Sequence, residues 1–315
     1  DQKNSIGINN FGKKFKDIYI HYLMKQNDIK QIMVLNIDII SYTRKIENRF
    51  FFKKITSYID NKVSSYFINI LTFLNVLNKI EICFTTKTNL LKNFENTNKF
   101  KKKFLFYKKV ILVNSVAYDE VKSKKLKTAN KNILFIDYNI NHEDNVKIGK
   151  EMNKKIIRNH YEQLNFLLKK ISQLYKKKIV VSIHPLYSIA ETKRFFNNYK
   201  VIKNKTLDLI RKAEIIILFN STVINFAYLL NKKILFLKTK KIGKGPEKEF
   251  NTFPEKSGCP QIDIHSADNL TKHELELQFK KNILKKKNFI KKYFIPDGSH
   301  IGSDKLIHVI KKNFY

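Results

Sequence analysis

Between residues 132 and 237, short strand-like runs alternate with segments of helical spacing, and this alternation constrains the fold more than any other feature. Runs such as Ile215–Phe219 are apolar at every position, as required of a strand whose sheet is covered by helices on both faces. The connecting loops are short, which predicts a parallel sheet with right-handed crossovers. We expect strands at 132–137, 179–183, 200–203, 214–219 and 234–237, and helices at 148–171, 206–212 and 221–230 and after Ser188.

The first half of the chain predicts a second, smaller α/β domain. Strands are expected at 32–38, 80–84 and 110–114. A helix expected at 61–79 carries an apolar stripe formed by Val63, Phe67, Ile70, Leu74 and Leu77. The polar, basic segment 127–131 suggests domains at 1–130 and 131–315, with a terminal helix at 299–314 that returns to the first. Two such domains indicate the GT-B type of architecture, in which two Rossmann-like parallel-sheet domains face a cleft.

The chain is strongly basic: 62 Lys and Arg against 27 Asp and Glu give a formal net charge of +35. Lysine is spread over the whole sequence. This distribution fits solvated surface lysines, and it also fits contact with an anionic membrane surface or a polyanion. No aromatic-rich RNA-binding signature, Cys/His finger or basic heptad accompanies the charge, so nucleic acid is not an expected partner. The most apolar stretch, 67–77, is too short to span a bilayer, and any membrane contact is expected to be peripheral.

The motifs of several common protein classes are missing. Cys83 and Cys259 lie far apart and have no metal-ligand spacing, and residues 1–10 show no signal-peptide pattern. A cytoplasmic location is therefore expected, with peripheral contact at the inner face of the cytoplasmic membrane. The sequence has no Asp-x-Asp motif, which argues against a metal-dependent mechanism of the GT-A type. It also has no Gly-x-Gly-x-x-Gly and no P-loop, which argues against dehydrogenases and P-loop kinases. We expect neither a metal nor a cofactor.

Polar residues gather where the predicted strands end. His184-Pro185 follows strand 179–183, and Asn220-Ser221-Thr222 follows strand 214–219. The carboxyl ends of parallel strands share one edge of the sheet, and ligands of open α/β sheets bind there. A histidine and two hydroxyls at the start of a helix suit a phosphate that leaves from an activated nucleotide. The alternative is structural: the hydroxyls cap the helix, and the histidine bonds a nearby carbonyl.

Carboxylates near this edge are candidates for the other roles. Asp208, on the helix expected to be capped by Thr206, suits either ribose hydroxyls or the helix dipole. The general base is expected to be Asp137, at the end of its strand, or Asp119 with Glu120, after strand 110–114. Further residues expected in the cleft are Asn139, His142 and Glu143.

The segments Val181-Ser-Ile-His-Pro185 and Phe219-Asn-Ser-Thr-Val-Ile-Asn-Phe-Ala227 resemble the bacterial GT-B sialyltransferases and polysialyltransferases, and the related Kdo-type transferases. The resemblance covers about residues 132–237. It implies an inverting, metal-independent transfer of a nonulosonic acid from a CMP-activated donor to a glycan or glycolipid of the bacterial surface. His184 would be the general acid or phosphate ligand, Ser221 and Thr222 would bind the CMP phosphate, and Asp208 would hold the ribose. Domain 131–315 would bind the donor, and domain 1–130 the acceptor.

The sequence departs from those families at one place. The acidic motif that supplies the base in them is missing, and its nearest counterpart, Tyr118-Asp-Glu120, lacks the glycine.

Three alternatives to this interpretation remain. Teichoic-acid alditol-phosphate transferases with CDP donors also pair a His-Pro with hydroxyls, but they usually carry an acidic residue where this chain has Asn225. UDP-sugar 2-epimerases share the architecture, but their Gly-rich turn and helix glutamate are absent. From a different class, the chain could be a basic protein that binds nucleic acid or polyanions without catalysis.

Overall fold

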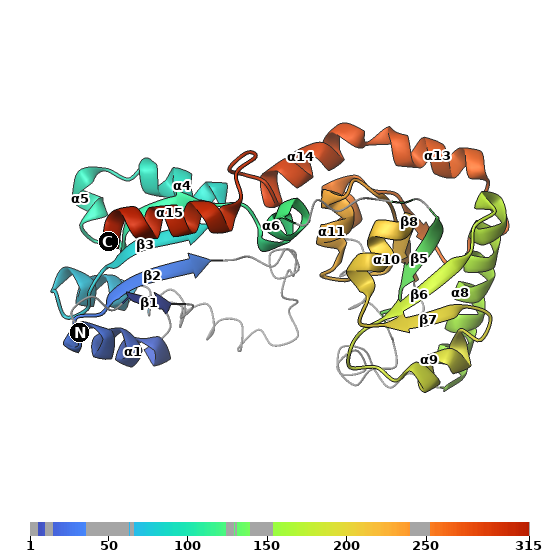
Figure 1. Ribbon diagram of the computed structural model, residues 1–315, viewed down its shortest axis with the longest axis horizontal. Helices are drawn as coiled ribbons and strands as arrows, with labels where there is room; N and C mark the ends of the chain where they lie inside the picture. The colour runs from blue at the N-terminus through green and yellow to red at the C-terminus, as the bar shows by residue number, and fades with distance from the viewer. Residues whose placement is uncertain are drawn as a thin grey trace. The chain divides into compact units, whose positions relative to one another are not determined.

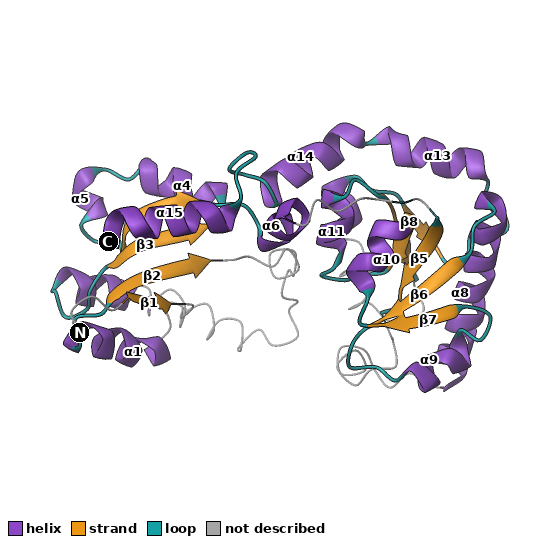
Figure 2. Cartoon of the chain, viewed as in Figure 1, coloured by secondary structure: helices purple, strands orange, loops and turns teal. Residues whose placement is uncertain are grey.

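The computed structural model describes residues 6–9, 15–35, 63, 66–123, 129, 131–138, 154–239 and 253–314. Within these ranges the chain forms two compact units (Figures 1 and 2). The first contains the described residues up to Asp119 together with those from Lys292 onward, and the second runs from Glu120 to Lys291. The sequence-based ranges 1–130 and 131–315 differ from these units mainly at the end, because the last helix follows the second unit in the chain but packs in the first.

The first unit is built on a four-stranded parallel sheet in which neighbours in the sheet are also neighbours in the chain. Its strands are β1 (Ile6–Asn9), β2 (Lys30–Leu35), β3 (Ile80–Thr85) and β4 (Tyr107–Leu112). The connections contain α1 (Phe15–Gln26), a helix over residues 66–73, α4 (Thr88–Glu95) and α5 (Lys99–Lys102), and α6 (Val116–Ser123) follows β4. Right-handed crossovers that always step in one direction leave their helices on one face of a sheet.

The two faces of this sheet have separate cores. On one face Met33, Cys83 and Val110 pack with Ile68, Leu77 and Phe106 and with side chains of α1 and α4. On the other face Ile32, Ile82, Phe84 and Val113 pack against α15 (Gly302–Phe314), through Leu306, Val309, Ile310 and Phe314. Figure 1 shows α15 and α1 on opposite sides of this sheet. The predicted return of the terminal helix to the first domain is therefore confirmed.

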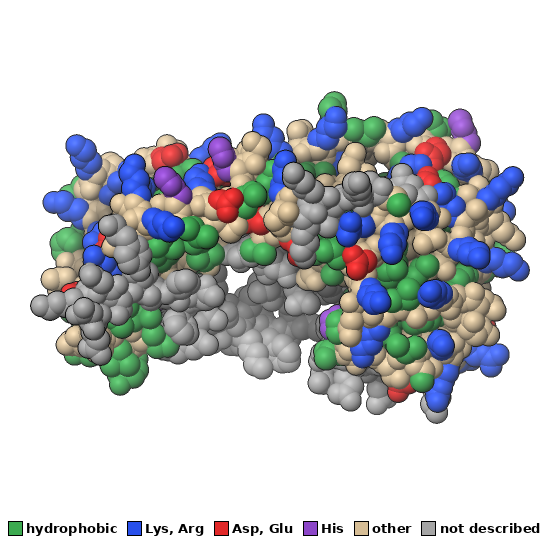
Figure 3. All heavy atoms as spheres, in the orientation of Figure 1, with side chains coloured by type: hydrophobic (Ala, Val, Ile, Leu, Met, Phe, Trp, Pro, Cys, Tyr) green, Lys and Arg blue, Asp and Glu red, His purple; other side chains and the backbone are tan. Residues whose placement is uncertain are grey.

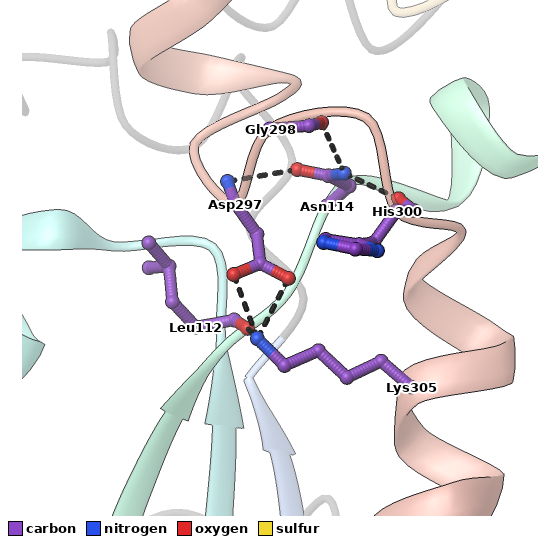
Figure 4. A network of polar contacts seen from close by, with 6 residues as sticks. All are labelled: Leu112, Asn114, Asp297, Gly298, His300 and Lys305. Carbon is purple, nitrogen blue, oxygen red and sulfur yellow. Dashed lines mark hydrogen bonds and ion pairs between the residues drawn. The ribbon is translucent and has the colours of Figure 1, made fainter.

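The segment before α15 is fastened to the end of β4 (Figure 4). The buried Asn114 amide donates to the carbonyls of Gly298 and His300, at 2.9 and 2.5 Å, and its oxygen accepts from the Asp297 N–H at 3.0 Å. The Lys305 ammonium bonds both carboxylate oxygens of Asp297 at 2.7 Å and also the Leu112 carbonyl at 3.1 Å. This network closes a contact between segments that lie far apart in the sequence.

Asp119 completes the attachment. Its two carboxylate oxygens accept from the backbone N–H groups of Gly302 and Ser303, both at 2.8 Å, and so satisfy free donors at the first turn of α15. Gly302 suits this close approach, because a Cβ there would lie only 3.0 Å from the Asn114 carbonyl oxygen. The predicted candidate base Asp119 therefore has a structural role.

The helix over residues 66–73 does not bury the predicted stripe. Its inward residues are Ile68, Leu71 and Thr72. Of the stripe, Leu77 is buried, whereas Val63, Phe67, Ile70 and Leu74 are 43–62% exposed. The expectation was wrong because the helix carries apolar residues around most of its circumference, so periodicity alone does not show which side meets the sheet.

The second unit contains a six-stranded parallel sheet in the order β10-β9-β8-β5-β6-β7. Numbered from β5, this order is 3-2-1-4-5-6, that of the Rossmann fold. The strands are β5 (Asn132–Ile136), β6 (Ile179–Ile183), β7 (Lys200–Lys203), β8 (Ala213–Leu218), β9 (Lys233–Lys238) and β10 (Gln261–Asp263). The winding direction reverses between β5 and β8. The prediction of two Rossmann-like parallel sheets is confirmed.

Helices cover both faces of this sheet. They are α8 (Lys154–Tyr175), α9 (Ile189–Phe195), α10 (Thr206–Lys212), α11 (Ile224–Leu229), α13 (Lys272–Lys281) and α14 (Ile283–Tyr293). Alternate strand residues face opposite sides: Ile133 and Phe135 pack with α8 in one core, while Leu134 is buried toward the face that carries α10. Ser188 is the N-cap of α9 and accepts from the Glu191 N–H, and Thr271 forms a capping box with Glu274 at the start of α13.

An ionic network ties one end of this unit together. The Lys233 ammonium lies 3.1 Å from Glu214 and 2.7 Å from Glu276, and Glu276 also accepts from the Tyr175 hydroxyl at 2.8 Å. Burial alone would raise the pKa values of both carboxyls, but hydrogen bonds from Lys233 and its neighbours outweigh burial and lower them. The network joins β8 and β9 to α8 and α13.

We expect Asn114→Ala to lower the free energy of unfolding of the first unit by about 3 kcal/mol, because three hydrogen bonds of a buried amide are lost. Urea denaturation followed by circular dichroism measures the change. Asn313→Ala, which removes an exposed amide of α15, is the control and should stay within about 0.5 kcal/mol of wild type. Equal effects of the two substitutions would contradict the anchoring role of Asn114.

His160 should make the second unit sensitive to acid. Its ring is 4% exposed and packs 5.4 Å from Phe219, and burial, assisted by the charge of His265, lowers its pKa to about 3. In the unfolded chain the pKa of a histidine is about 6.5. Between pH 6.5 and pH 3 the unfolded chain therefore binds a proton at His160 that the folded protein does not bind, and the free energy of unfolding falls as the pH falls below about 6.5.

The expected loss from this residue is about 2 kcal/mol between pH 7 and pH 5. Urea titrations at both pH values measure it in wild type and in His160→Leu, which should flatten the dependence. The control His273→Leu replaces an exposed histidine of the second unit and should leave the pH dependence of the unfolding free energy as in wild type. A slope that survives in His160→Leu would contradict this prediction.

Candidate functional site

A pocket of about 260 Å³ opens where β5, β6 and β8 end, on both sides of the reversal of winding. In open α/β sheets this switch point is the place where ligands bind. The volume is near the lower end of the range for small-molecule sites. Of the residues predicted for the site, the pocket brings together Asp137, His184, Pro185, Asn220, Ser221 and Thr222.

His184 is held by a tight turn directly after β6. The Tyr187 N–H donates to the His184 carbonyl at 3.0 Å, and Pro185 occupies the second position, where its fixed φ favours the turn. The His184 Nδ1 accepts from the Leu186 N–H at 3.2 Å. In the neutral ring the proton therefore sits on Nε2. The exposed side chain is thus presented with Nε2 as a hydrogen-bond donor.

The segment from Asn220 to Thr222 is an irregular turn after β8 and not the first turn of a helix. Helix α11 begins at Ile224, and its N-cap, Val223, makes no side-chain cap. The predicted helix start at Ser221 is thus corrected, and capping does not explain the two hydroxyls. Within the described part of the chain, neither the Ser221 nor the Thr222 hydroxyl forms a hydrogen bond, and both residues line the pocket. Both hydroxyls are available to a ligand.

Thr206 is a pocket residue that sequence reasoning assigned to another role. It was expected to cap α10, but the N-cap is Lys205, and the Thr206 hydroxyl instead lies 2.8 Å from the buried Ser182 hydroxyl. A polar residue inside the otherwise apolar run 179–183 was the available signal. The predicted ribose ligand Asp208 does not line the pocket; its carboxylate is 60% exposed and lies 3.3 Å from Arg211.

Two tyrosines were also missed. Tyr138 and Tyr187 line the pocket, and the Tyr187 ring lies 5.3 Å from the His184 ring. Both follow strand ends by a few residues, but nothing in the local sequence distinguishes them from other tyrosines of the chain. They give the pocket aromatic surface beside its polar groups.

Asp137 supplies the negative charge. It directly follows β5, is 8% exposed, and its N–H donates to the Ser182 carbonyl at 2.9 Å. Among the described residues that line the pocket, it is the only carboxylate.

The other predicted carboxylates are not brought into this pocket. Asp119 caps α15, and Glu120 follows it on α6. The predicted cleft residues Asn139, His142 and Glu143 lie outside the described residues. Over the described ranges, no group of three or more His, Cys, Asp or Glu residues is placed to hold a metal ion. Cys83 and Cys259 are both buried.

Of the helices in the described ranges, none combines the length and the apolar character needed to cross a membrane.

No protein-family model and no curated protein matches the sequence. Among solved structures, UDP-GlcNAc 2-epimerase from Methanocaldococcus jannaschii is similar over 98% of this chain and 76% of that chain, with 16% identity and a TM-score of 0.50. The Neisseria meningitidis UDP-GlcNAc 2-epimerase bound to UDP-GlcNAc has 13% identity and a TM-score of 0.46 over 98% and 75% of the two chains. The wall teichoic acid polymerase TagF has 14% identity and a TM-score of 0.48 over 98% and 72%.

The similarity to the Methanocaldococcus jannaschii structure supports the fold. The chain has two parallel-sheet α/β units and a GT-B type architecture, as the sequence predicted. At such low identity the likeness carries no information on the reaction.

Proposed function

We propose that this protein is a glycosyltransferase that moves a nonulosonic acid, of sialic acid or Kdo type, from a CMP-activated donor to a hydroxyl of a bacterial surface glycan or glycolipid. The observation that carries the proposal is the convergence of His184 Nε2 and the hydroxyls of Ser221 and Thr222 on one pocket at the switch point of a Rossmann sheet. These side chains offer hydrogen-bond donors to one pocket, which suits the binding of a phosphate.

The donor phosphate would lie against the turn after β8. Ser221 and Thr222 would each donate a hydroxyl hydrogen bond to its oxygens. The His184 Nε2–H would donate to the oxygen that departs from the sugar. Stabilising charge that grows on this oxygen lowers the barrier, because the interaction strengthens as the bond to the sugar breaks.

The acceptor hydroxyl would attack the anomeric carbon from the side opposite the phosphate. One carbon–oxygen bond forms to the acceptor, one breaks to CMP, and the acceptor proton goes to a base. We assign that role to Asp137, because it is the carboxylate that the described residues bring into the pocket. The two substrates supply all the reacting groups, so the step needs no resident metal or cofactor.

The choice of CMP rests on the resemblance of segments 181–185 and 219–227 to CMP-dependent transferases. A CDP-alditol donor would use the same phosphate contacts, so nucleotide preference is the property to measure first. The net charge of +35 also fits a polyanion-binding protein without catalysis.

In a thermal-shift titration with CMP, CDP, UDP, GDP and a short DNA, we expect stabilisation by CMP. Ligand at a hundred times its Kd should add about 2.7 kcal/mol. The shift should be lost in the double variant Ser221→Ala, Thr222→Ala and retained in Thr97→Ala, Ser303→Ala, which removes hydroxyls of the first unit.

Other outcomes of this titration identify the alternatives. Preference for CDP over CMP would favour the alditol-phosphate transferase. Stabilisation by DNA alone, or by every anion equally, would overturn the transferase proposal.

His184→Ala should lower kcat of the transfer by about 10²–10⁴-fold while CMP still binds, because the lost hydrogen bond strengthens only as the phosphate leaves. Asp137→Asn should lower kcat to a similar extent. Release of CMP in the presence of a glycan acceptor measures both effects. Asp208→Asn, outside the pocket, is the control and should retain activity. Full activity in His184→Ala would contradict the assignment.

A further inference from the structure

The first unit exposes apolar side chains on the helices that cover one face of its sheet. On α1 the exposed residues are Tyr19, Tyr22 and Leu23, and on the helix over 66–73 and the turn after it they include Tyr66, Ile70, Phe73, Leu74 and Val76. Phe100 on α5 is 68% exposed. We call these nine residues the apolar patch. Figure 3 shows hydrophobic side chains gathered over α1, at the lower left.

Contacts within the patch join the three helices. The Phe73 ring stacks on Phe104 with centroids 4.4 Å apart, and Phe104 in turn contacts the Phe100 ring at 5.5 Å. The Lys25 ammonium at the end of α1 bonds the carbonyl of Asn75. Beneath α1 and the helix over 66–73 lies one buried core, to which Ile18, Ile68 and Leu71 contribute. The exposed residues of these two helices therefore lie on their outer side, and Phe100 is linked to them through Phe104.

The inward-facing residues of the helix over 66–73 and of the turn after it already pack in the core on this face of the sheet. Ile68, Thr72 and Leu77 are 6% exposed or less, so the outward residues are not needed to complete the core. An exposed apolar surface of this kind, made by several neighbouring residues, is typical of an interaction site.

The charge around the patch selects the partner. Lys99, Lys101, Lys102 and Lys103 surround Phe100 on α5, and Lys79 and Lys25 lie beside the 66–76 segment. Segments 66–80 and 96–106 contain no Asp or Glu. In these two segments, aromatic and aliphatic side chains flanked by lysine and free of carboxylates match the boundary between acyl chains and anionic headgroups.

We propose that the apolar patch is a docking surface for an anionic lipid bilayer, with Phe100 and Leu74 entering the acyl boundary and the α5 lysines contacting the headgroups. The helices would lie in the plane of the interface. The proposal does not depend on the reaction at the pocket, because every residue involved belongs to the first unit.

The absence of tryptophan from the chain gives a direct test. Phe100→Trp places a single reporter in the patch, and Leu284→Trp places one on an equally exposed site of the second unit. On titration with phosphatidylglycerol-containing vesicles, the emission of the first should shift to the blue and become protected from iodide. Emission of the second should not change. Pure phosphatidylcholine vesicles should give a much smaller response in both.

Cosedimentation then separates the apolar and ionic contributions. Leu74→Ser with Phe100→Ser should lower the vesicle partition coefficient at least about tenfold. The control Leu277→Ser with Leu284→Ser removes two exposed apolar side chains of the second unit and should have little effect. Lys99→Gln with Lys101→Gln should weaken binding more than Lys287→Gln with Lys291→Gln, although both pairs change the net charge equally.

Two outcomes would overturn the proposal. Equal binding by the patch variant and its control would show that the membrane does not contact these residues. A wild-type dimer that becomes monomeric in the patch variant, with vesicle binding unchanged, would show that a second copy of the chain covers the patch. Thermal melting of each variant establishes that it is folded, and CMP-induced stabilisation tests the pocket separately.

Discussion

The structure depends on the need of a parallel sheet for cover on both faces. Each sheet meets this need in a different way. The first sheet adds its strands in one direction, so right-handed crossovers leave its helices on one face. The opposite face, with Ile32, Ile82 and Phe84, would meet water if α15 did not pack there. Asn114 and Asp119 fasten this returning helix at the end of β4, and the last residues of the chain become part of the first unit.

The second sheet obtains its cover by reversing direction. Because β5 lies between β6 and β8, helices that follow the two directions fall on opposite faces. At this reversal the connections that follow neighbouring strands lead away from each other at the carboxyl edge of the sheet. The pocket lies at this point. With both faces covered, strand interiors must be almost wholly apolar. At the carboxyl edge, polar groups therefore gather at positions after the strands, where Asp137, His184 and Ser221 stand.

The sequence predicted the features that local chemistry determines. Predominantly apolar runs identified β5, β6, β8 and β9, and their parallel arrangement followed from the short connections. His184-Pro185 was recognisable because proline favours the turn that holds the ring. Strand order then brought His184 and Asn220–Thr222 into one pocket, as expected from the shared edge of the sheet.

The errors concern contacts that the local pattern does not encode. Ser221 and Thr206 have the residue type of a cap, but the N-caps of α11 and α10 are Val223 and Lys205, and Ser221 and Thr206 line the pocket instead. Asp119 has the residue type and the position of a catalytic carboxylate, but it accepts from two N–H groups of a segment more than 180 residues later in the chain. Local sequence does not show such a distant contact. Helical periodicity likewise identified a helix around Ile70 without showing which side faces the sheet. A sheet can bury only one side of a helix that is apolar on several sides, so part of the apolar surface of this helix stays exposed.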